Sequence, residues 1–472
     1  MSKVSDVIAP YLAEKLAGKR ANRGQWRMGT VGETGQFLNG VAFKPSDWGD
    51  DGIPIIRIQN LTDKSKPFNR TQREVETRYR VEHGDLLVSW SATLDAFIWD
   101  REPGFLNQHI FKVIPDERVV EKRFLFYLLK SAIQQMIASE HLHGSTMKHI
   151  NRGPFLAFPV PIPPFKEQRR IVAEIEEQFS CLEAGVAALK RVQTKLKCYR
   201  AAVLAAACAG HLVPTEADLA RVKGGSYETG DQLLTRIRQE RRTLRADTYK
   251  ESPSPNTDDL HGLPEGWVWA STGQLGEIIG GLTKNPKRDS LPRKLPYLRV
   301  ANVYADELRL DEIEQIGVAE SEFEKLRLES DDLLIVEGNG SLEQIGRVAR
   351  WDGSINPCVH QNHLIKIRIP GMNPRWVLLW MLSSVGRRQI ESVAASTSGL
   401  HTLSTGKVGR LPVPVPPLAE QHRIVAEVDR RLSFAREIEQ QVKIDLVRAG
   451  RFRQATLRRA LTEAPSQGIA YE

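Results

Sequence analysis

The chain has 472 residues, of which 41% are hydrophobic and 26% charged, so it has the composition of an ordinary folded protein and is too long for a single hydrophobic core. Its 66 Lys and Arg against 58 Asp and Glu give a formal net charge of +8, which fits a partner with phosphate groups without requiring one. Four cysteines without a C-x-x-C pair argue against a zinc site or a disulfide framework, and no apolar run reaches membrane-spanning length, so we expect a cytoplasmic protein.

The chain begins with an amphipathic segment, residues 1–21, which we expect to form a short helix. Strand-like phrases separated by turn residues follow over residues 22–156 and predict a mixed α/β domain. Residues 157–212 carry apolar side chains every three or four positions, which predicts one long helix with a stiff, extended proline-rich lead-in. A connector over residues 213–261 contains one predicted charged helix, Asp231–Asp247, and a linker-like Pro/Ser stretch.

The same order then repeats, with a second mixed domain predicted over residues 262–410, a second long helix over 411–464 and a tail over 465–472. The phrase that opens the first helix is FPVPIPPFKEQRRIVAE from Phe158, and the phrase that opens the second is LPVPVPPLAEQHRIVAE from Leu411. They are identical at 12 of 17 positions and lie 253 residues apart (411 − 158). A repeat this long indicates two copies of one large unit, and a function that needs something done twice.

Shorter phrases inside the two domains also correspond. GDLLVS at Gly84 resembles DDLLIV at Asp331, and NQHIFKV at Asn107 resembles QNHLIKI at Gln361, while the offset between the copies drifts from 241 to 254 residues. This drift is typical of one fold used twice with loops of different length. We therefore predict an α+β protein in which two related mixed α/β domains are joined by two long helices.

Neither long helix can bury its narrow apolar stripe alone, so we expect the two to pack together as an intramolecular coiled coil, either antiparallel or parallel. A plain dimerisation coil would show the same stripe. Glu167 and Glu420 fall near the positive N-terminal ends of the two helices. The residues predicted to pack between the helices are Ile171, Ile175, Leu182, Leu189, Leu196, Ile424, Val428, Ile438 and Val442.

These phrases resemble the specificity subunits of type I restriction–modification enzymes, in which two target-recognition domains are each followed by a proline-rich phrase, E-Q, I-V and a long helix. PIPPFKEQRRIVAEIE and PVPPLAEQHRIVAEVD match both copies, LPEGW at Leu263 matches the usual entry into a recognition domain, and HLVP at His211 the usual exit from the first helix. The resemblance covers nearly the whole chain. It departs at the start, where no LPEGW precedes Trp26. Trp26 and Trp267 open the two domains and are expected to be packing residues.

The resemblance implies a DNA-binding subunit that has no catalytic activity of its own and reads a bipartite, non-palindromic site. It implies double-stranded DNA, two methyltransferase (modification) subunits and two restriction/translocase subunits as partners, and no membrane. S-adenosylmethionine, ATP and Mg²⁺ would be bound by those partner subunits. This chain itself would bind neither a cofactor nor a metal.

The motifs of the catalytic subunits are missing from the sequence. No lysine has Asp or Glu two positions before it, so the metal-binding [DE]-x-K arrangement of common nucleases is absent. The two Pro-Pro pairs follow Ile162 and Val415, so the N-P-P-[FYW] loop of an adenine methyltransferase is absent, and no G-x-x-x-x-G-K-[ST] phosphate loop occurs. A stand-alone restriction or methylation enzyme would carry these motifs. A protein-binding coiled-coil scaffold would keep the helices without needing two domains with polar loops.

Contacts with DNA are expected from polar and basic side chains on loops, because these reach the groove edges and the phosphates. The candidates are Lys44, Arg57, Trp90, Ser91, Thr93, Asn107, Gln108, Ser145, Thr146 and Lys148 in the first domain, and Lys284, Lys287, Arg288, Arg299, Asn339, Ser341, Gln361, Asn362, Ser398 and His401 in the second. No residue is predicted to be catalytic.

Each candidate also has a purely structural interpretation. Any one of the polar segments can be an ordinary loop, and Arg57 and Arg299 can form ion pairs at the edge of a core. The neighbouring His109 and His363 can be buried hydrogen-bond partners. Basic residues near the C-terminal ends of the helices can compensate the helix dipole, be solvated, or contact partner subunits. These are Lys190, Arg191, Lys195, Lys197, Arg200, Arg448, Arg451, Arg453, Arg458 and Arg459.

Overall fold

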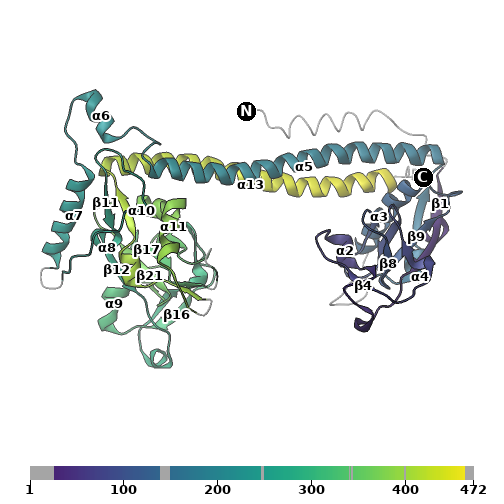
Figure 1. Cartoon of the computed structure of the whole chain (residues 1–472), viewed down its shortest axis with the longest axis horizontal. Helices are drawn as coiled ribbons and strands as arrows, with labels where there is room; N and C mark the ends of the chain where they lie inside the picture. Colours follow the sequence, from purple (N-terminus) through teal and green to yellow (C-terminus); the bar gives the residue numbers. More distant parts are fainter. Residues whose placement is uncertain are drawn as a thin grey trace, which may run out of the picture. The chain divides into compact units, whose positions relative to one another are not determined.

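The computed structural model describes residues 26–138, 149–245, 249–339, 341, 344–397 and 400–462 (Figure 1). The chain forms two compact units, one made of residues 1–189 with 443–472 and the other of residues 190–442. The long helices α5 (Phe165–Cys208) and α13 (Leu418–Thr462) each contribute one part to each unit. Within the described ranges, no helix has the length and hydropathy needed to cross a membrane.

The mixed domain of the first unit contains two four-stranded sheets. Its elements are η2 (Val31–Thr34), β2 (Gly35–Asn39), η3 (Pro45–Asp47), β3 (Ile53–Ile56), α2 (Ile58–Thr62), β4 (Asn69–Thr71), η4 (Thr77–Tyr79), β5 (Arg80–Val81), β6 (Leu86–Ser89), β7 (Asp95–Ile98), β8 (Gly104–Leu106), β9 (Ile110–Pro115), α3 (Lys122–Ala138) and α4 (Arg152–Leu156). One sheet has the antiparallel order β2-β9-β6-β7, and the other the order β4-β3-β8-β5 with β3 and β8 parallel. Successive side chains of β6 point to opposite faces, so Leu86 and Val88 pack toward α3 while Leu87 packs against the second sheet.

The second unit repeats this arrangement. Its elements are α8 (Thr272–Leu275), β12 (Glu277–Gly280), η5 (Pro286–Ser290), β13 (Lys294–Leu298), η6 (Val300–Asn302), β14 (Val303–Tyr304), β15 (Glu307–Leu308), β16 (Glu314–Gly317), α9 (Glu320–Leu326), β17 (Leu333–Val336), β18 (Gly338–Asn339), β19 (Val348–Arg350), β20 (Val359–His360), β21 (Leu364–Arg368), α10 (Pro374–Leu382), α11 (Ser384–Val393), β22 (Ala395–Thr397), β23 (Leu400–Thr402) and α12 (Thr405–Gly409). Two of its sheets have the orders β12-β21-β17-β19, antiparallel, and β16-β13-β20, with β13 and β20 parallel. The prediction of two related mixed domains is confirmed.

The proline-rich phrases before the long helices are extended, as the sequence predicts, and each forms a strand that is paired with another. Strand β10 (Pro159–Ile162) pairs antiparallel with β1 (Arg27–Thr30), and β24 (Pro412–Val415) pairs in the same way with β11 (Val268–Ser271). The first and last strands of each domain therefore lie side by side. This pairing places the start of each long helix directly beside the entry to its domain.

Alternate prolines suit a strand that is paired on one side only, because proline has no N–H to donate to a second neighbour. In β24 the carbonyl groups of Pro412 and Pro414 are bonded instead by buried indoles. Trp376 Nε1 donates to the Pro414 carbonyl at 2.9 Å, and Trp380 Nε1 donates to the Pro412 carbonyl at 2.7 Å. The proline phrase is thus fixed between a strand and helix α10.

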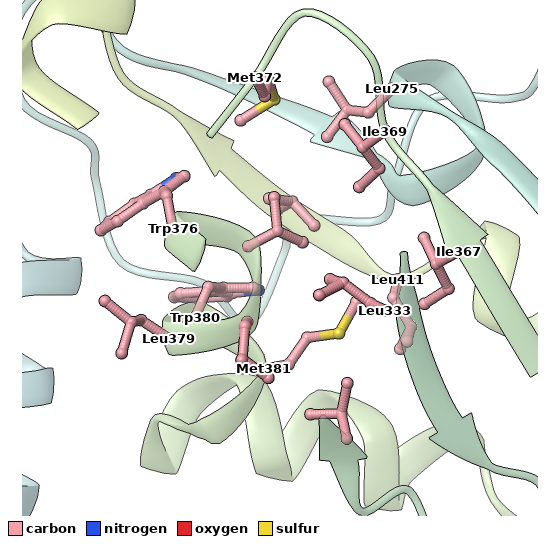
Figure 2. Close-up of a cluster of buried hydrophobic side chains, with 14 of the residues drawn as sticks. Leu275, Leu333, Ile367, Ile369, Met372, Trp376, Leu379, Trp380, Met381 and Leu411 are labelled. Atoms are coloured by element: carbon pink, nitrogen blue, oxygen red, sulfur yellow. The ribbon is translucent and has the colours of Figure 1, made fainter. Parts of the chain in front are cut away.

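The core of the second unit joins α10 to the larger sheet. Figure 2 shows Trp376, Trp380 and Met381 of α10 in one cluster with Leu333 of β17 and Ile367 of β21. Each of these side chains is at most 1% exposed. Because burying a large apolar side chain stabilises a fold by about 1.5–3 kcal/mol, this cluster fixes α10 firmly on the sheet.

In the first unit, the N-terminal part of α5 runs antiparallel to the C-terminal part of α13. Ile171 and Ile175 of α5 share one buried cluster with Leu457 and Leu461 of α13. Further along the pair the residue numbers rise in α5 and fall in α13. A side-chain oxygen of Gln178 lies 3.3 Å from the hydroxyl of Thr456, and the carboxylate of Glu183 lies 3.4 Å from the guanidinium of Arg453. The core of the mixed domain continues into this helix pair.

The other parts of the two helices pair in the same sense in the second unit. Val203 and Ala207 of α5 share a buried cluster with Ile424 and Val428 of α13. Arg200 donates to Glu439 at 2.7 Å. The predicted intramolecular coiled coil is confirmed, and the pairing is antiparallel in both units.

The residues predicted to pack between the helices differ in burial. The seam residues near the ends of the helix pair are buried, and along its middle they are half-buried apart from buried Val442, as expected for a seam between only two helices. The buried set is Ile171, Ile175, Ile424, Val428 and Val442, and the half-buried set is Leu182, Leu189, Leu196 and Ile438.

A fully buried glutamine fixes the start of α5 to its domain. Gln168 donates from Nε2 to the carbonyls of Pro163 (2.8 Å) and Val119 (3.1 Å), and its Oε1 accepts from the N–H of Glu121 (2.7 Å). In the second unit Gln421 does the same, donating to the Pro416 carbonyl (2.9 Å) and accepting from the backbone before α10. The glutamine of the E-Q pair therefore has the same structural role in both phrases: it joins the start of the long helix to its domain.

The connector packs on the second unit. The sequence predicts one helix here, and the structure has two, α6 (Glu216–Lys223) and α7 (Gly230–Leu244).

Buried Glu420 accepts hydrogen bonds from Trp267 Nε1 at 3.0 Å and from the first backbone N–H of α6 at 2.8 Å. Burial raises the pKa of this carboxyl. Ile237 of α7 lies in the domain core. The predicted segments 1–21 and 465–472 lie outside the described residues.

Replacing Gln421 with Ala should destabilise the second unit. The substitution leaves the Pro416 carbonyl and the N–H of Asn373 without a partner in a buried place, so we expect the free energy of unfolding to fall by about 1–3 kcal/mol. Urea denaturation followed by tryptophan fluorescence measures this change. His422→Ala, at the exposed next position, is the control and should cost less than about 0.5 kcal/mol. Equal losses for the two variants would contradict the role given to Gln421.

Candidate DNA interface

A polar turn of the first domain, Asn107–His109, is held by two neighbouring segments. The N–H of Asn107 donates to the carbonyl of Ile56 at the end of β3 (3.1 Å). The N–H of Gln108 donates to the carbonyl of Val41, which follows β2 (2.9 Å). The turn therefore lies where the ends of both sheets meet.

The second domain holds its turn, Gln361–His363, through the same two bonds. The N–H of Gln361 donates to the carbonyl of Leu298 at the end of β13 (2.9 Å), and the N–H of Asn362 donates to the carbonyl of Leu282 (2.9 Å). Because only backbone atoms take part, the turn keeps its place while its side chains differ between the domains.

Glycine is required where the chain crosses each turn. A Cβ atom on Gly40 would lie 2.2 Å from the carbonyl oxygen of Asn107, and one on Gly281 would lie 2.3 Å from that of Gln361. No L side chain fits at these distances from a backbone atom. The two glycines allow the loops after β2 and β12 to pass directly over the turns.

A second segment is hydrogen-bonded to the last residue of each turn. In the first domain the N–H of Trp90 donates to the carbonyl of His109 (3.3 Å), and the N–H of Ile150 donates to the carbonyl of Trp90 (3.0 Å). Ser91 forms a β-bridge with His149. Segments from three distant parts of the sequence thus meet at one place.

The second domain has the corresponding bonds. Glu337 donates from its N–H to the carbonyl of His363 (2.9 Å) and accepts at its own carbonyl from the N–H of Leu403 (2.7 Å), while Asn339 pairs with His401 in a short ladder. We call this arrangement the polar-loop assembly. It consists of residues 40–44, 57, 90–91 and 107–109 in the first unit, and of residues 281–284, 299, 337–339 and 361–363 in the second.

The side chains of the assembly range from packed to exposed. The ring of Trp90 lies against His109, with 5.2 Å between ring centroids, and Ser91 is only 7% exposed, whereas Thr93 is exposed. The side chains of His109 and His363 are both exposed, so the interpretation of these two as buried hydrogen-bond partners is wrong. In the second domain Ser341 is exposed, and Gln361 and Asn362 are half-buried, as Asn107 is in the first.

The equivalent arginines after β3 and β13 have different partners. Arg57 donates to Asn69 Oδ1 at 3.0 Å, and its guanidinium lies over the ring of Trp48, 4.8 Å from the centroid. Arg299 donates instead to the carboxylate of Glu314 at 2.6 Å. The ion-pair interpretation therefore holds for Arg299, while Arg57 has a neutral hydrogen-bond partner.

The predicted phosphate contacts of the second domain are partly paired with acidic residues. Lys284 donates to Glu314 at 2.9 Å, and this bond, with the nearby charge of Arg299, holds the pKa of the Glu314 carboxyl below its ordinary value. Arg288 is largely buried and forms two hydrogen bonds with Glu322, at 2.9 and 3.0 Å. Lys287 is exposed. So is Lys44 in the loop of the first domain.

Some candidates cannot be placed in this arrangement. Ser145, Thr146, Lys148 and Ser398 lie outside the described residues. On the helices, Arg200 pairs with Glu439, Arg448 with Asp445 and Arg453 with Glu183.

The sequence did not indicate Asn69 and Glu314, the residues that face the two arginines. Both lie one strand away from the arginine they contact, and no local motif marks them. Their correspondence follows from the strand pairing, in which Asn69 lies opposite Ile55 and Glu314 lies opposite Tyr297. The phrases that contain the two arginines, PIIRIQNL over residues 54–61 and PYLRVANV over residues 296–303, resemble each other, but an alignment of them does not reach Asn69 or Glu314.

Replacing Gly281 with Ala should loosen the turn of the second domain. The added Cβ forces the loop away from the Gln361 carbonyl, and overpacking of this kind costs about 1–3 kcal/mol. We expect the amide hydrogen of Asn362 to exchange roughly tenfold faster or more in the variant. Gly406→Ala in α12 is the matched control, since its nearest atom would be 4.0 Å away. Unchanged exchange in Gly281→Ala would show that the crossing does not hold the turn.

The chain matches a family model along most of its length. The model of the type I restriction modification DNA specificity domain covers residues 24–185 and 264–447, one match for each repeat. The Type I restriction enzyme EcoBI specificity subunit of Escherichia coli is 25% identical over 463 residues, which covers 95% of this chain and 88% of that protein. The EcoKI specificity subunit of Escherichia coli strain K12 is 23% identical over 460 residues, covering 92% and 88%.

Solved structures agree in fold. A chain from a structure of type I R-M system assembly and conformational transition aligns with a TM-score of 0.64 at 16% identity, covering 94% of this chain and 99% of that one. The HsdS subunit from Thermoanaerobacter tengcongensis aligns with a TM-score of 0.50 at 17% identity, covering 94% and 98%. With two matched repeats, each containing one polar-loop assembly, this chain belongs to the type I restriction–modification DNA specificity family, whose members recognise DNA and are not catalytic.

Proposed function

We propose that this chain reads a bipartite, non-palindromic DNA site and positions the subunits that methylate, translocate and cut the DNA. The observation that carries the proposal is the presence of one polar-loop assembly in each unit. Two separate reading domains are expected to read two separate short motifs, with base pairs between them that neither domain contacts.

The two half-motifs should differ in sequence, because the two assemblies present different side chains on equivalent backbones. Trp90 of the first domain corresponds to Glu337 of the second, and Asn107 corresponds to Gln361. An indole and a carboxylate offer different hydrogen-bonding groups to a base edge, and bases are distinguished by their donor and acceptor patterns. Unequal side chains at equivalent positions support a non-palindromic site.

The two long helices are suited to set the distance between the half-motifs. Both helices contribute to both units, and an α-helix is stiff and rises about 1.5 Å per residue. A pair of such helices would hold the unread gap at a constant number of base pairs. The half-buried seam residues, such as Leu189 and Ile438, would keep the two helices together along the gap.

The chemistry belongs to partner subunits in this proposal. Two methyltransferase subunits would bind S-adenosylmethionine and methylate adenine at N6. Two restriction/translocase subunits would use ATP and Mg²⁺ to move and cut the DNA. The role of this chain is to bind the target site and to bring those subunits to it.

Mapping methylated adenines in a host genome that carries this gene tests the proposal most directly. We expect two different short motifs separated by a constant gap, each with its methylated adenine. Equilibrium binding of the purified complex to that sequence should fall steeply with salt, because phosphate contacts release counterions. One contiguous motif, or a palindrome, would contradict the two-domain reading.

Exchanging one recognition domain should change one half-motif only. We expect that replacing residues 22–156 with the equivalent block of another specificity subunit changes the half read by the first domain and preserves the other half and the gap. The reason is that each polar-loop assembly is built entirely within its own domain. Sequencing of methylated sites measures the outcome, and a change in both halves, or in neither, would show that the domains do not read independently.

Lengthening the helices should lengthen the gap. Four residues inserted between Val186 and Lys197 of α5, with four added to α13 to match, extend the helix pair by about 6 Å and turn its end by about 40°. B-DNA advances about 3.4 Å per base pair, so we expect the gap to grow by one or two base pairs while both half-motifs stay the same. The same sequencing of methylated sites reads the gap directly. An unchanged gap with full methylation would mean that the helices do not set the spacing.

A further inference from the structure

Arg57 and Arg299 occupy the same position in the two recognition domains. Each is the first residue after its strand, β3 or β13, and each donates its backbone N–H to an asparagine side chain three residues later. These bonds are 3.1 Å to Asn60 and 2.8 Å to Asn302. The backbone therefore presents both guanidinium groups from the same corner of the fold, next to the turn of the polar-loop assembly.

The residue that faces each arginine also occupies the same position. In the strand pairing, Asn69 lies opposite Ile55, two residues before Arg57, and Glu314 lies opposite Tyr297, two residues before Arg299. Each facing side chain accepts one hydrogen bond from the Nη1 atom of its arginine, at 3.0 and 2.6 Å. The two domains thus differ at this corner by an amide in one and a carboxylate in the other.

This difference decides whether the arginine faces a carboxylate. In the second domain Arg299 forms an ion pair with the carboxylate of Glu314, which also accepts from Lys284 and from the hydroxyl of Tyr297 at 3.2 Å. In the first domain Asn69 orients Arg57 without cancelling its charge, and within the described part of the chain Arg57 forms no ion pair with a carboxylate. A guanidinium that is oriented but not neutralised is a ready donor for an anion or for paired acceptors.

The ring of Trp48 adds to this preorganisation. The guanidinium of Arg57 lies over it at 4.8 Å, so less conformational freedom remains to be lost when a ligand binds. An arginine that is already paired with a carboxylate behaves differently. Before Arg299 could contact DNA, its ion pair with Glu314 would have to be broken or the carboxylate would have to lie close to the DNA, and both are unfavourable.

We propose that Arg57 contacts DNA directly in the first recognition domain, that Arg299 does not do so in the second, and that the facing residue, Asn69 or Glu314, decides between the two. The DNA group is a pair of acceptors that matches the guanidinium edge, either phosphate oxygens or O6 and N7 of guanine. The proposal rests on the proposed function, because it assumes that both domains bind DNA. It assigns Asn69 and Glu314 the role of positioning residues, which act on DNA binding through the arginine that each one faces.

The test uses the full chain in its complex with the methyltransferase subunits and a duplex carrying the mapped site. Arg57→Ala removes the contact, and Asn69→Asp keeps the shape of the side chain but adds a carboxylate beside Arg57. We expect both to weaken binding on the order of 10-fold to 100-fold, as for loss of a bidentate base contact. Arg70→Ala is the matched control. Arg70 lies beside Asn69 on β4 and is paired with exposed Glu102, so this variant should bind DNA like the parent chain.

The second domain supplies the reciprocal test. Arg299→Ala should weaken binding far less than Arg57→Ala does. Glu314→Gln keeps an acceptor for Arg299 while removing the charge, so binding should tighten at low salt and the salt dependence should become steeper. Thermal unfolding of each variant shows whether the domains stay folded. Equal losses for Arg57→Ala and Arg299→Ala, or an unchanged salt dependence for Glu314→Gln, would overturn the proposal.

Two further measurements separate the sources of the acceptors. If Arg57 binds guanine, Arg57→Ala loses discrimination at one base pair of the first half-motif. If it binds phosphate, the variant weakens binding to all sequences alike and lowers the salt slope by about one. Either result supports the contact. Failure of the proposed function appears differently, as a parent complex that shows no bipartite site, whereas a parent complex that reads its site and is unaffected by Arg57→Ala contradicts this inference alone.

Discussion

The burial of the first turns of the long helices inside the domain cores is the constraint on which the remaining architecture depends. Ile175 and Val428 are at most 1% exposed, whereas Leu189, farther along its helix, is only half-buried. A two-helix seam by itself buries little apolar area, so most of the stabilisation of each helix comes from its domain. Gln168 and Gln421 add buried hydrogen bonds at the same place. Domain and helix end are therefore one structure, and a reading domain cannot turn freely on its helix.

A backbone scaffold that does not depend on side chains allows one fold to carry different side chains at equivalent loop positions. The turns at Asn107 and Gln361, and the segments at Trp90 and Glu337, are joined by main-chain hydrogen bonds that recur at the same positions in both units. Side chains on these loops can change without loss of those bonds. The glycine at the crossing of each turn cannot change, because its neighbours are backbone atoms. The main-chain hydrogen bonds and the glycines thus stay constant, while the loop side chains can differ between the two domains.

Net charge says little about where DNA would bind this protein. Many of its cations are paired with carboxylates, as Arg288 is with Glu322 and Arg299 is with Glu314, so the excess of +8 is not a measure of a basic surface. What matters is the local balance at the loops. With an amide, Asn69, in place of a carboxylate, Glu314, the arginine of the first domain has a neutral partner, whereas the arginine of the second domain is held in an ion pair.

The sequence by itself determined the duplication, the two long helices and the family, because these are carried by phrases such as PIPPFKEQ and by a spacing of three and four that local physics imposes. It also placed Asn107, Gln361 and Trp90 on loops. Tertiary structure decided the rest. The antiparallel sense of the helices depends on shared packing such as that of Ile175 with Leu457, which lie 282 residues apart in the chain (457 − 175). The partners of the arginines were decided in the same way, since strand pairing brings Asn69 and Glu314 to them across 12 and 15 residues, and pairing between strands leaves no mark in a local pattern.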